Sequence, residues 1–368
     1  MTRIRAKSGS ELRDVFEHFL DSTLPEGWDL ELIPADRSGS DQGFDYVITG
    51  PDGNQALITV EAKVQVSPAN VPRMAAKLRD VQAALRGGPH ASTKAVIVSN
   101  FISKRSQELL EAAGIGWFDP TGNTKVETDR PSLFIRQSGA DQDPNPDTED
   151  RRKKSLRGPG AARVVRALLD GASDTRVHAL AANANVGAAT SARVLGYLAQ
   201  EHLVERDEHA TVRRVHKRSL VRAWARDYGI TRTNHTTTVL APRGLDWVVE
   251  QLAERRLPHV LTGSAALRRY LPEGIPAVTP LSLLAIYSEQ TPALQRELRL
   301  RNTERGANVL LIEPFDQAVL QRTRDIDGHR YSAPSQTVVD LLTSPGRGPE
   351  EAEQLIEVLA QNDKEWSL

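Results

Sequence analysis

The sequence contains no cysteine and no apolar run of about 18 residues, the length needed to cross a membrane. Without thiols the chain cannot form a disulfide or a thiolate metal site, which agrees with a reducing compartment. The first residues lack the apolar segment of a secretory signal. The nine histidines show no close ligand pairing along the chain. We therefore expect a cytoplasmic protein without a membrane contact.

Charge is unevenly distributed along the 368 residues, although the net charge is only -1. Residues 151–232 contain 17 Lys and Arg against 7 Asp and Glu, whereas the segments on either side are acidic. A basic middle between acidic flanks is typical of a chain in which one module contacts the phosphate backbone of nucleic acid. The alternative interpretation is a basic face that is merely solvated.

The length predicts more than one domain, and the composition suggests where they divide. Asp141–Asp150 has five acids, two prolines and no large apolar side chain, so it predicts a linker. The basic run Arg151–Arg157 follows as an arm for phosphate contacts or as a solvated domain edge. We expect four parts: an α/β domain at 1–140, the linker and arm at 141–157, a helix-turn-helix at 158–232 and an α+β domain at 233–368.

The spacing of apolar residues from Ala161 to Val215 predicts three short helices followed by two short strands. This order is typical of a winged helix-turn-helix, in which the first residues of the third helix meet base edges of duplex DNA. The outward face of that helix would carry the candidate DNA-binding residues Ala188, Ala189, Thr190, Ser191 and Arg193. The second strand of the wing would add Arg213 and Arg214. Trp224 and Tyr228, four residues apart on the following helix, are expected in the core.

The first 140 residues predict a mixed sheet flanked by helices, in the order α-β-β-β-α-β. Glu61 and Lys63 are two apart on one predicted strand and leave it on the same face, and a hairpin can bring Asp45 beside them. Asp45 and Glu61 could hold Mg²⁺ while Lys63 positions an attacking water, which is the chemistry of phosphodiester hydrolysis. A surface Glu-Lys pair on an edge strand is the plainer interpretation.

Three stretches of this domain resemble the PD-(D/E)xK restriction-endonuclease-like superfamily, especially its Mrr-like branch. They are Phe16-Glu17, the loop Gly39–Gly43 before Asp45, and Val60–Lys63. The resemblance covers about residues 8–137 and implies catalytic Asp45, Glu61 and Lys63, with Glu17 as the helix carboxylate. Glu11 is the alternative for that role. The family's proline before the first acid is absent, because Phe44 occupies its place.

The last 130 or so residues contain a strand, His259–Thr262, followed by Gly263-Ser264 and a helix. This arrangement resembles the start of a nucleotidyltransferase fold, whose turn approaches a nucleotide phosphate. The family then requires an Asp-x-Asp pair on the next strand, but here Leu281–Tyr287 contains no acid. We therefore expect a degenerate, non-catalytic domain in which Gly263 serves a tight turn.

From about Leu109 onward the chain resembles the AbiEi-type antitoxins of type IV toxin-antitoxin systems. The resembling stretches are the winged helix and Ala113–Asn123, Gly306–Leu311 and Ala333–Leu342. The resemblance implies a transcriptional regulator that controls its own operon and contacts a nucleotidyltransferase-like toxin. A homodimer is left open.

The favoured hypothesis is therefore a sequence-specific DNA-binding regulator without a cofactor. The alternative is a Mg²⁺-dependent DNA endonuclease of restriction or defence type that the winged helix delivers to double-stranded DNA. A third reading keeps only protein contacts with a toxin.

Overall fold

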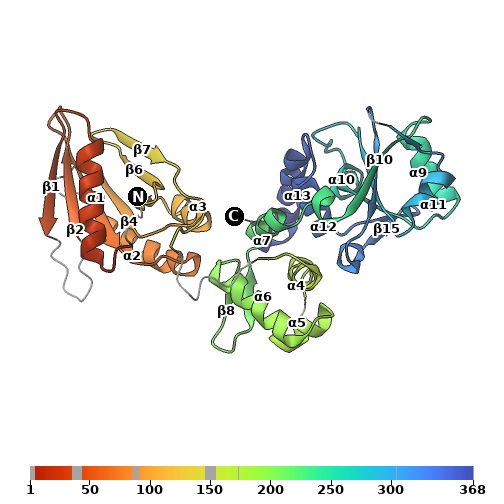
Figure 1. Cartoon of the computed structure of the whole chain (residues 1–368), viewed down its shortest axis with the longest axis horizontal. Helices are drawn as coiled ribbons and strands as arrows, with labels where there is room; N and C mark the ends of the chain where they lie inside the picture. The colour runs from red at the N-terminus through yellow and green to blue at the C-terminus, as the bar shows by residue number, and fades with distance from the viewer. Residues whose placement is uncertain are drawn as a thin grey trace. The chain divides into compact units, whose positions relative to one another are not determined.

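The computed structural model describes residues 5–34, 44–85, 90, 92–145, 155–172, 174–303 and 305–367. The chain divides into two compact units, Met1–Lys153 and Lys154–Leu368 (Figure 1). The loop Gly39–Gly43 and most of the predicted linker and basic arm, residues 146–154, lie outside the described residues. The predicted boundary between residues 232 and 233 falls inside the second unit and stays a prediction.

The first unit is built on one seven-stranded sheet with the strands in chain order, β1 to β7. Its helices and strands are α1 (Gly9–Thr23), β1 (Asp29–Pro34), β2 (Phe44–Thr49), β3 (Gln55–Ala62), α2 (Val71–Ala84), β4 (Ser92–Val98), α3 (Lys104–Ala112), β5 (Gly116–Phe118), β6 (Thr124–Thr128) and β7 (Leu133–Gln137). The sequence predicted this mixed α/β unit but did not predict β6.

The sheet is antiparallel from β1 to β3, parallel from β3 to β5, and antiparallel again from β5 to β7. One face packs on α1 through a core that includes Tyr46, Ile58 and Val60. The other face packs on α2 and α3 through Ala95, Ile97 and their neighbours. Strands β4 and β5 therefore send alternate side chains into two separate cores. Helix α1 lies across the front of the sheet in Figure 1.

Helix α1 is amphipathic, and its apolar face is set by a four-residue spacing. Leu12, Phe16 and Leu20 are all fully buried, and the Phe16 ring lies 5.1 Å from that of Phe118. At the start of the helix the hydroxyl of the N-cap residue, Ser8, accepts from the Glu11 amide at 3.2 Å. The Glu11 carboxylate in turn accepts from the Lys7 amide at 2.8 Å. This reciprocal cap fixes where α1 starts.

The second unit begins with helices and a hairpin and continues into a second sheet. Its first elements are α4 (Pro159–Leu169), α5 (Val177–Asn183), α6 (Ala188–Gln200), β8 (Val204–Arg206), β9 (Val212–Val215), α7 (Lys217–Asp227) and α8 (Ile230–Thr233). Its remaining elements are β10 (His235–Leu240), α9 (Leu245–Glu254), β11 (Val260–Thr262), α10 (Gly263–Tyr270), β12 (Leu284–Tyr287), α11 (Thr291–Glu297), β13 (Arg301–Asn302), β14 (Val309–Glu313), β15 (Arg324–Ile326), β16 (His329–Tyr331), α12 (Pro334–Leu342) and α13 (Gly348–Asn362).

The second sheet is also mixed and has the strand order β13-β10-β14-β12-β11-β16-β15. Helix α7 joins the two halves of this unit, because it contacts both α4 and α12. Trp224 and Tyr228, predicted as core residues, are 1% and 2% exposed. They belong to one hydrophobic cluster that extends from Leu156 to Trp366. The helix-turn-helix segment and the carboxyl-terminal segment therefore share a core.

Candidate functional site

Asp45 and Glu61 share one face of the first sheet. Strand β2 pairs antiparallel with β3 so that Asp45 lies opposite Thr59, two residues before Glu61. Residues directly opposite each other point to the same face, and diagonal neighbours have Cα atoms about 7–8 Å apart. The predicted convergence of the two carboxyl-bearing positions on one face thus follows from the strand register.

Glu61 is only 5% exposed, and its charge is balanced by two lysines. The Nζ of Lys63 lies 3.4 Å from Oε1 of Glu61, and the Nζ of Lys77, from α2, lies 3.5 Å from Oε2. The Lys63 amide donates to the Val98 carbonyl at 2.9 Å, which holds the chain in place just past the end of β3. Each oxygen of this buried carboxylate therefore has an ammonium group beside it, as its burial requires.

The predicted helix carboxylate, Glu17, is not brought to this face. The apolar side of α1 packs on the opposite face of the sheet, where Tyr46 and Val60 point. Burial raises the pKa of Tyr46 well above its usual range, and the nearby charge of Glu17 raises it further. Glu11, the alternative, caps the start of α1. The sequence could not separate the two, because it does not say which face of the sheet α1 covers.

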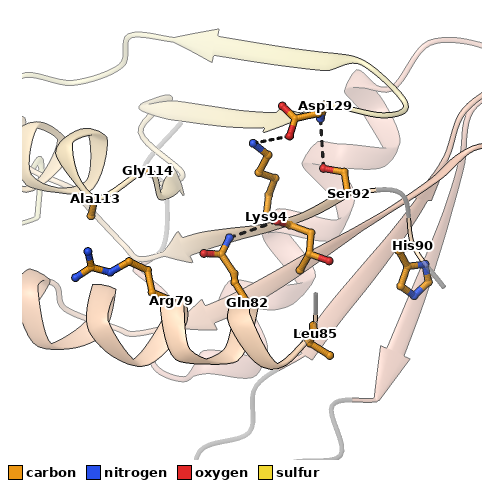
Figure 2. A pocket seen from close by; sticks show the side chains of 10 residues that line it. Arg79, Gln82, Leu85, His90, Ser92, Lys94, Ala113, Gly114 and Asp129 are labelled. Carbon is orange, nitrogen blue, oxygen red and sulfur yellow. Dashed lines mark hydrogen bonds and ion pairs between the residues drawn. The ribbon is translucent and has the colours of Figure 1, made fainter. Parts of the chain in front are cut away.

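A polar cavity of about 490 Å³ lies at the end of the parallel strands β3 and β4 that is opposite to Glu61 (Figure 2). Lys94, on β4, pairs with Asp129 at 2.9 Å within it, and the Asp129 amide donates to the Ser92 hydroxyl at 3.4 Å. Ser92 pairs with Ala56 at the start of β3, whereas Glu61 pairs with Ile97 near its end. The cavity is therefore separate from the Asp45 and Glu61 positions.

Helix α6 presents a smooth outer face. Ala189, Ala192, Arg193 and Gly196 are exposed, and a side chain at Gly196 would meet nothing within 4 Å. Ala188 and Thr190 are half-buried at the edge of this face. Among the described residues, no side chain forms an ion pair with Arg193. The exposed guanidinium is the main polar feature of this surface.

The prediction for Ser191 was wrong, because this side chain does not lie on the outward face. Ser191 is fully buried, and its hydroxyl donates to the Val177 carbonyl at 3.1 Å. It occupies the same stripe as Val194, Leu195 and Leu198, at positions three, four and seven residues later. Its polarity suggested exposure, but the helical period places it against α5.

The two predicted arginines of β9 are exposed, and each lies near an acid of the β8–β9 hairpin. Arg213 pairs with Asp207 at 2.6 Å, and Arg214 lies 3.9 Å from Glu205. Their side chains are 68% and 52% exposed, so both ion pairs are open to solvent. Solvent-exposed pairs are weak enough for a phosphate to compete for the guanidinium.

Several basic residues of the positive segment pair with acids of the carboxyl-terminal half. Both oxygens of Asp316 accept from Arg163, at 2.9 and 2.8 Å. Further pairs join Lys217 to Asp363, Arg218 to Glu357 and Arg222 to Glu353. Part of the charge asymmetry along the sequence is therefore an internal match between two packed segments.

Gly263 and Ser264 open helix α10, and Gly263 has a φ of +60°, which suits a glycine turn. A cavity of about 300 Å³ lies beside this turn. The Ser264 hydroxyl donates to Glu351, which is 1% exposed and also accepts from Thr279 at 2.5 Å. Glu351 is also paired with Arg268 at 3.6 Å. The neighbouring strand β12 reads Leu284-Ala285-Ile286-Tyr287 without an acid.

The stretch Ala333–Leu342 lies on α12 and is almost entirely internal. Asp340 is fully buried and accepts hydrogen bonds from four side chains. The donors are Tyr228 at 2.7 Å, Thr262 at 2.6 Å, Gln336 at 2.8 Å and Tyr287 at 3.0 Å. Gln336 also accepts from the buried Arg166 at 2.8 Å. This motif holds the second unit together from within.

One cluster escaped the sequence analysis. His202, Glu205 and His216 offer ligand atoms that all lie within 4.8 Å of one another. The two histidines are not close along the chain and come together only in the fold. The signal was hard to find because His202 and His216 are far apart in sequence and meet only through the pairing of β8 with β9.

No family model and no curated protein matches this chain. One solved structure, "Structure of EndoMS in apo form", is similar to it at 16% identity with a TM-score of 0.23. That match covers 32% of this chain and 49% of the other, so it spans about half of that protein's length. Such a TM-score is too low to carry an argument about function. Among the described residues, no helix is long and apolar enough to cross a membrane.

Proposed function

We propose that this protein is a DNA-binding transcriptional regulator that contacts double-stranded DNA through α6 and the β8–β9 hairpin. The order of α4, α5, α6 and the hairpin supports a winged helix-turn-helix. The observation that carries the proposal is the outer face of α6, where small side chains surround the exposed Arg193. A helix with such a face can approach the floor of the major groove closely, and an arginine there can bind a guanine edge.

The test is a DNA-binding titration with the full-length chain, because α7 is covered by α12 and an isolated segment 151–232 would lose that packing. If about five phosphates are contacted, log K falls against log salt with a slope of about -4 to -5. Arg193→Ala should weaken specific binding by roughly 1–3 kcal/mol if this residue binds a guanine.

Arg255→Ala is a matched control, since this arginine is exposed and lies directly after α9 in the other half of the unit. It should leave the affinity unchanged. A full-length protein whose affinity is insensitive to salt, or an Arg193→Ala variant that binds like the parent, would contradict the proposal.

The antitoxin role is the finer part of the proposal, with a nucleotidyltransferase-like toxin as the partner. The arrangement around Gly263 supports the absence of transferase activity in this chain, because β12 lacks acids and the Ser264 hydroxyl is already bonded to Glu351. Incubation with labelled nucleotide triphosphates and Mg²⁺ should give no labelled RNA or protein. Transfer that disappears in a Gly263→Ala/Ser264→Ala double variant would show an active site there.

A second candidate, the nuclease, is favoured by the common face of Asp45 and Glu61 and by Lys63 beside them. Against it, both Glu61 oxygens already face an ammonium group, so this donor set does not fit a divalent cation as it stands. We therefore propose that the first unit keeps the arrangement of a nuclease as a structural remnant.

The two lysines on Glu61 provide an internal control for this question. If the first unit is a structural remnant, the protein cuts neither modified nor unmodified plasmid with Mg²⁺ or Mn²⁺. Lys63→Ala and Lys77→Ala should then lower the free energy of unfolding by similar amounts. An active nuclease instead loses cutting in Lys63→Ala and keeps it in Lys77→Ala, since only Lys63 stands in the Glu-x-Lys pattern. That second outcome would overturn the remnant assignment.

A further inference from the structure

The turn after α6, strand β8 and the first residue before α7 meet at the base of the hairpin. His202 follows α6, where its amide donates to the Ala199 carbonyl at 3.1 Å. The His216 amide donates to the Leu203 carbonyl at 3.0 Å and so continues the hairpin ladder past its last pair. Backbone hydrogen bonds thus fix both histidines, which are only partly exposed.

The side chains of these residues converge. Nε2 of His216 lies 3.0 Å from Oε1 of Glu205, and the rings of His202 and His216 have centroids 4.8 Å apart. The three ligand atoms lie within 4.8 Å of one another. Ligand atoms around a tetrahedral zinc ion are about 3.3 Å apart, as bonds of about 2.0 Å require. Small rotations of the side chains would therefore close the cluster around an ion.

We propose that His202, Glu205 and His216 form a binding site for a transition-metal ion of the zinc type. Two imidazoles and one carboxylate are the ligand set of zinc sites that leave a fourth position to water. The two nitrogen ligands favour Zn²⁺, Co²⁺ or Ni²⁺ and disfavour Mg²⁺ and Ca²⁺, which take oxygen ligands. All three side chains are half-buried, so an ion can enter from solvent.

The ion would add a direct link among three elements that already meet through backbone hydrogen bonds and the His216–Glu205 side-chain contact. His202 lies in the turn after α6, Glu205 on β8 and His216 directly before α7. Glu205 also lies 3.9 Å from Arg214, so metal binding at this carboxylate competes with that exposed ion pair. The site does not depend on DNA binding, and its test requires no DNA.

The experiment is a titration of the full-length, chelator-treated protein with Co²⁺ and Zn²⁺. Co²⁺ should give visible absorption bands that saturate at one ion per chain, and Zn²⁺ should displace it. At a Zn²⁺ concentration about 100 times its dissociation constant, the melting temperature should rise by about 5 °C or more. His202→Ala and His216→Ala should each weaken Zn²⁺ binding by roughly tenfold or more, because even residues that only orient metal ligands cost that much.

His209→Ala is the matched control, since His209 is exposed at the tip of the same hairpin. It should bind Zn²⁺ as the parent does. Glu205→Gln keeps the side-chain shape and guards against loss of folding; it should remain folded by circular dichroism and lose most of its affinity. Absence of cobalt bands and of a thermal shift in the parent would overturn the proposal. So would one tight site that persists in a His202→Ala/His216→Ala variant, because the ion would then bind elsewhere.

Discussion

Glu61 in the first unit and Asp340 in the second are both buried carboxylates, but different groups compensate their charges. Glu61 faces the ammonium groups of Lys63 and Lys77, whose side chains are 39% and 45% exposed. Asp340 has only neutral donors around it, drawn from hydroxyl and amide groups. The first carboxylate belongs to an arrangement that opens to solvent, whereas the second is an internal hub.

The two carboxylates therefore differ in whether their partners can also contact water. Lys63 and Lys77 reach water, so each can exchange its contact with Glu61 for one with solvent. The donors to Asp340 come from α12, β11, β12 and the residue after α7. Because they are buried, they cannot form hydrogen bonds to water instead. The stretch Ala333–Leu342 therefore serves the core of the second unit.

The largest effect is expected for Asp340→Ala. Truncation leaves the hydroxyls of Tyr228, Tyr287 and Thr262 without their acceptor inside the core, and buried donors without partners are costly. We expect the free energy of unfolding to fall by about 3–5 kcal/mol, measured by urea unfolding with circular dichroism. Asp325→Ala, at a side chain that is 76% exposed, is the control and should change little. A loss below about 1 kcal/mol would show that the hub is not essential.

A pH dependence should also follow from Asp340. Burial raises the pKa of Asp340 to about 6, although the hydrogen bonds from Thr262, Tyr228, Gln336 and Tyr287 oppose the rise. The folded state therefore holds this proton more strongly than the unfolded state, whose pKa is about 3.8. The contribution of Asp340 to the free energy of unfolding is greatest below about pH 4. It falls as the pH rises to about 6 and does not change further above that pH.

A comparison with Asp340→Asn isolates the pH-dependent contribution of Asp340 to stability, because the amide does not titrate. Unfolding free energies of the parent and the variant should be measured by urea from pH 4 to 7.5. The parent's stability relative to the variant should decrease between pH 4 and 6. The lowered pKa values of Asp316 and Asp363 act in the opposite direction but are common to both proteins, so they cancel. Parallel pH profiles would contradict a raised pKa at Asp340.

The contrast between the two carboxylates also explains which features the sequence could predict. The Glu61-x-Lys63 spacing and the helical spacing of Trp224 and Tyr228 are local, and a period of two or four residues is enough to place them on one face. Asp340 has partners at positions 228, 262 and 287. A local sequence pattern cannot predict contacts between residues so far apart in the chain. The paired lysine Lys77 was missed for the same reason, since it reaches Glu61 from another helix.

Two errors have equally physical causes. Ser191 was assigned to the outer face by its polarity, but a hydroxyl that satisfies a backbone carbonyl can be buried at little cost. The histidine cluster was missed because its members meet only when the hairpin pairs Val204 with Val215. Hairpin register can be guessed from a turn, but here the pairing also shifts between Glu205 and Arg206.

The smallest effect should come from Glu61→Gln. The amide keeps the shape of the side chain, and Lys63 and Lys77 can turn to water because both are well exposed. We expect the unfolding free energy to change by about 1 kcal/mol or less, measured by urea unfolding at low salt and at high salt. Because salt screens charges near the surface, the difference from the parent should shrink at high salt. The effect of Asp340→Ala should persist there, since its partners are neutral and buried. If Glu61→Gln instead costs as much as Asp340→Ala at both salt concentrations, Glu61 is a core residue of the first unit and its two lysines are not exchangeable with solvent.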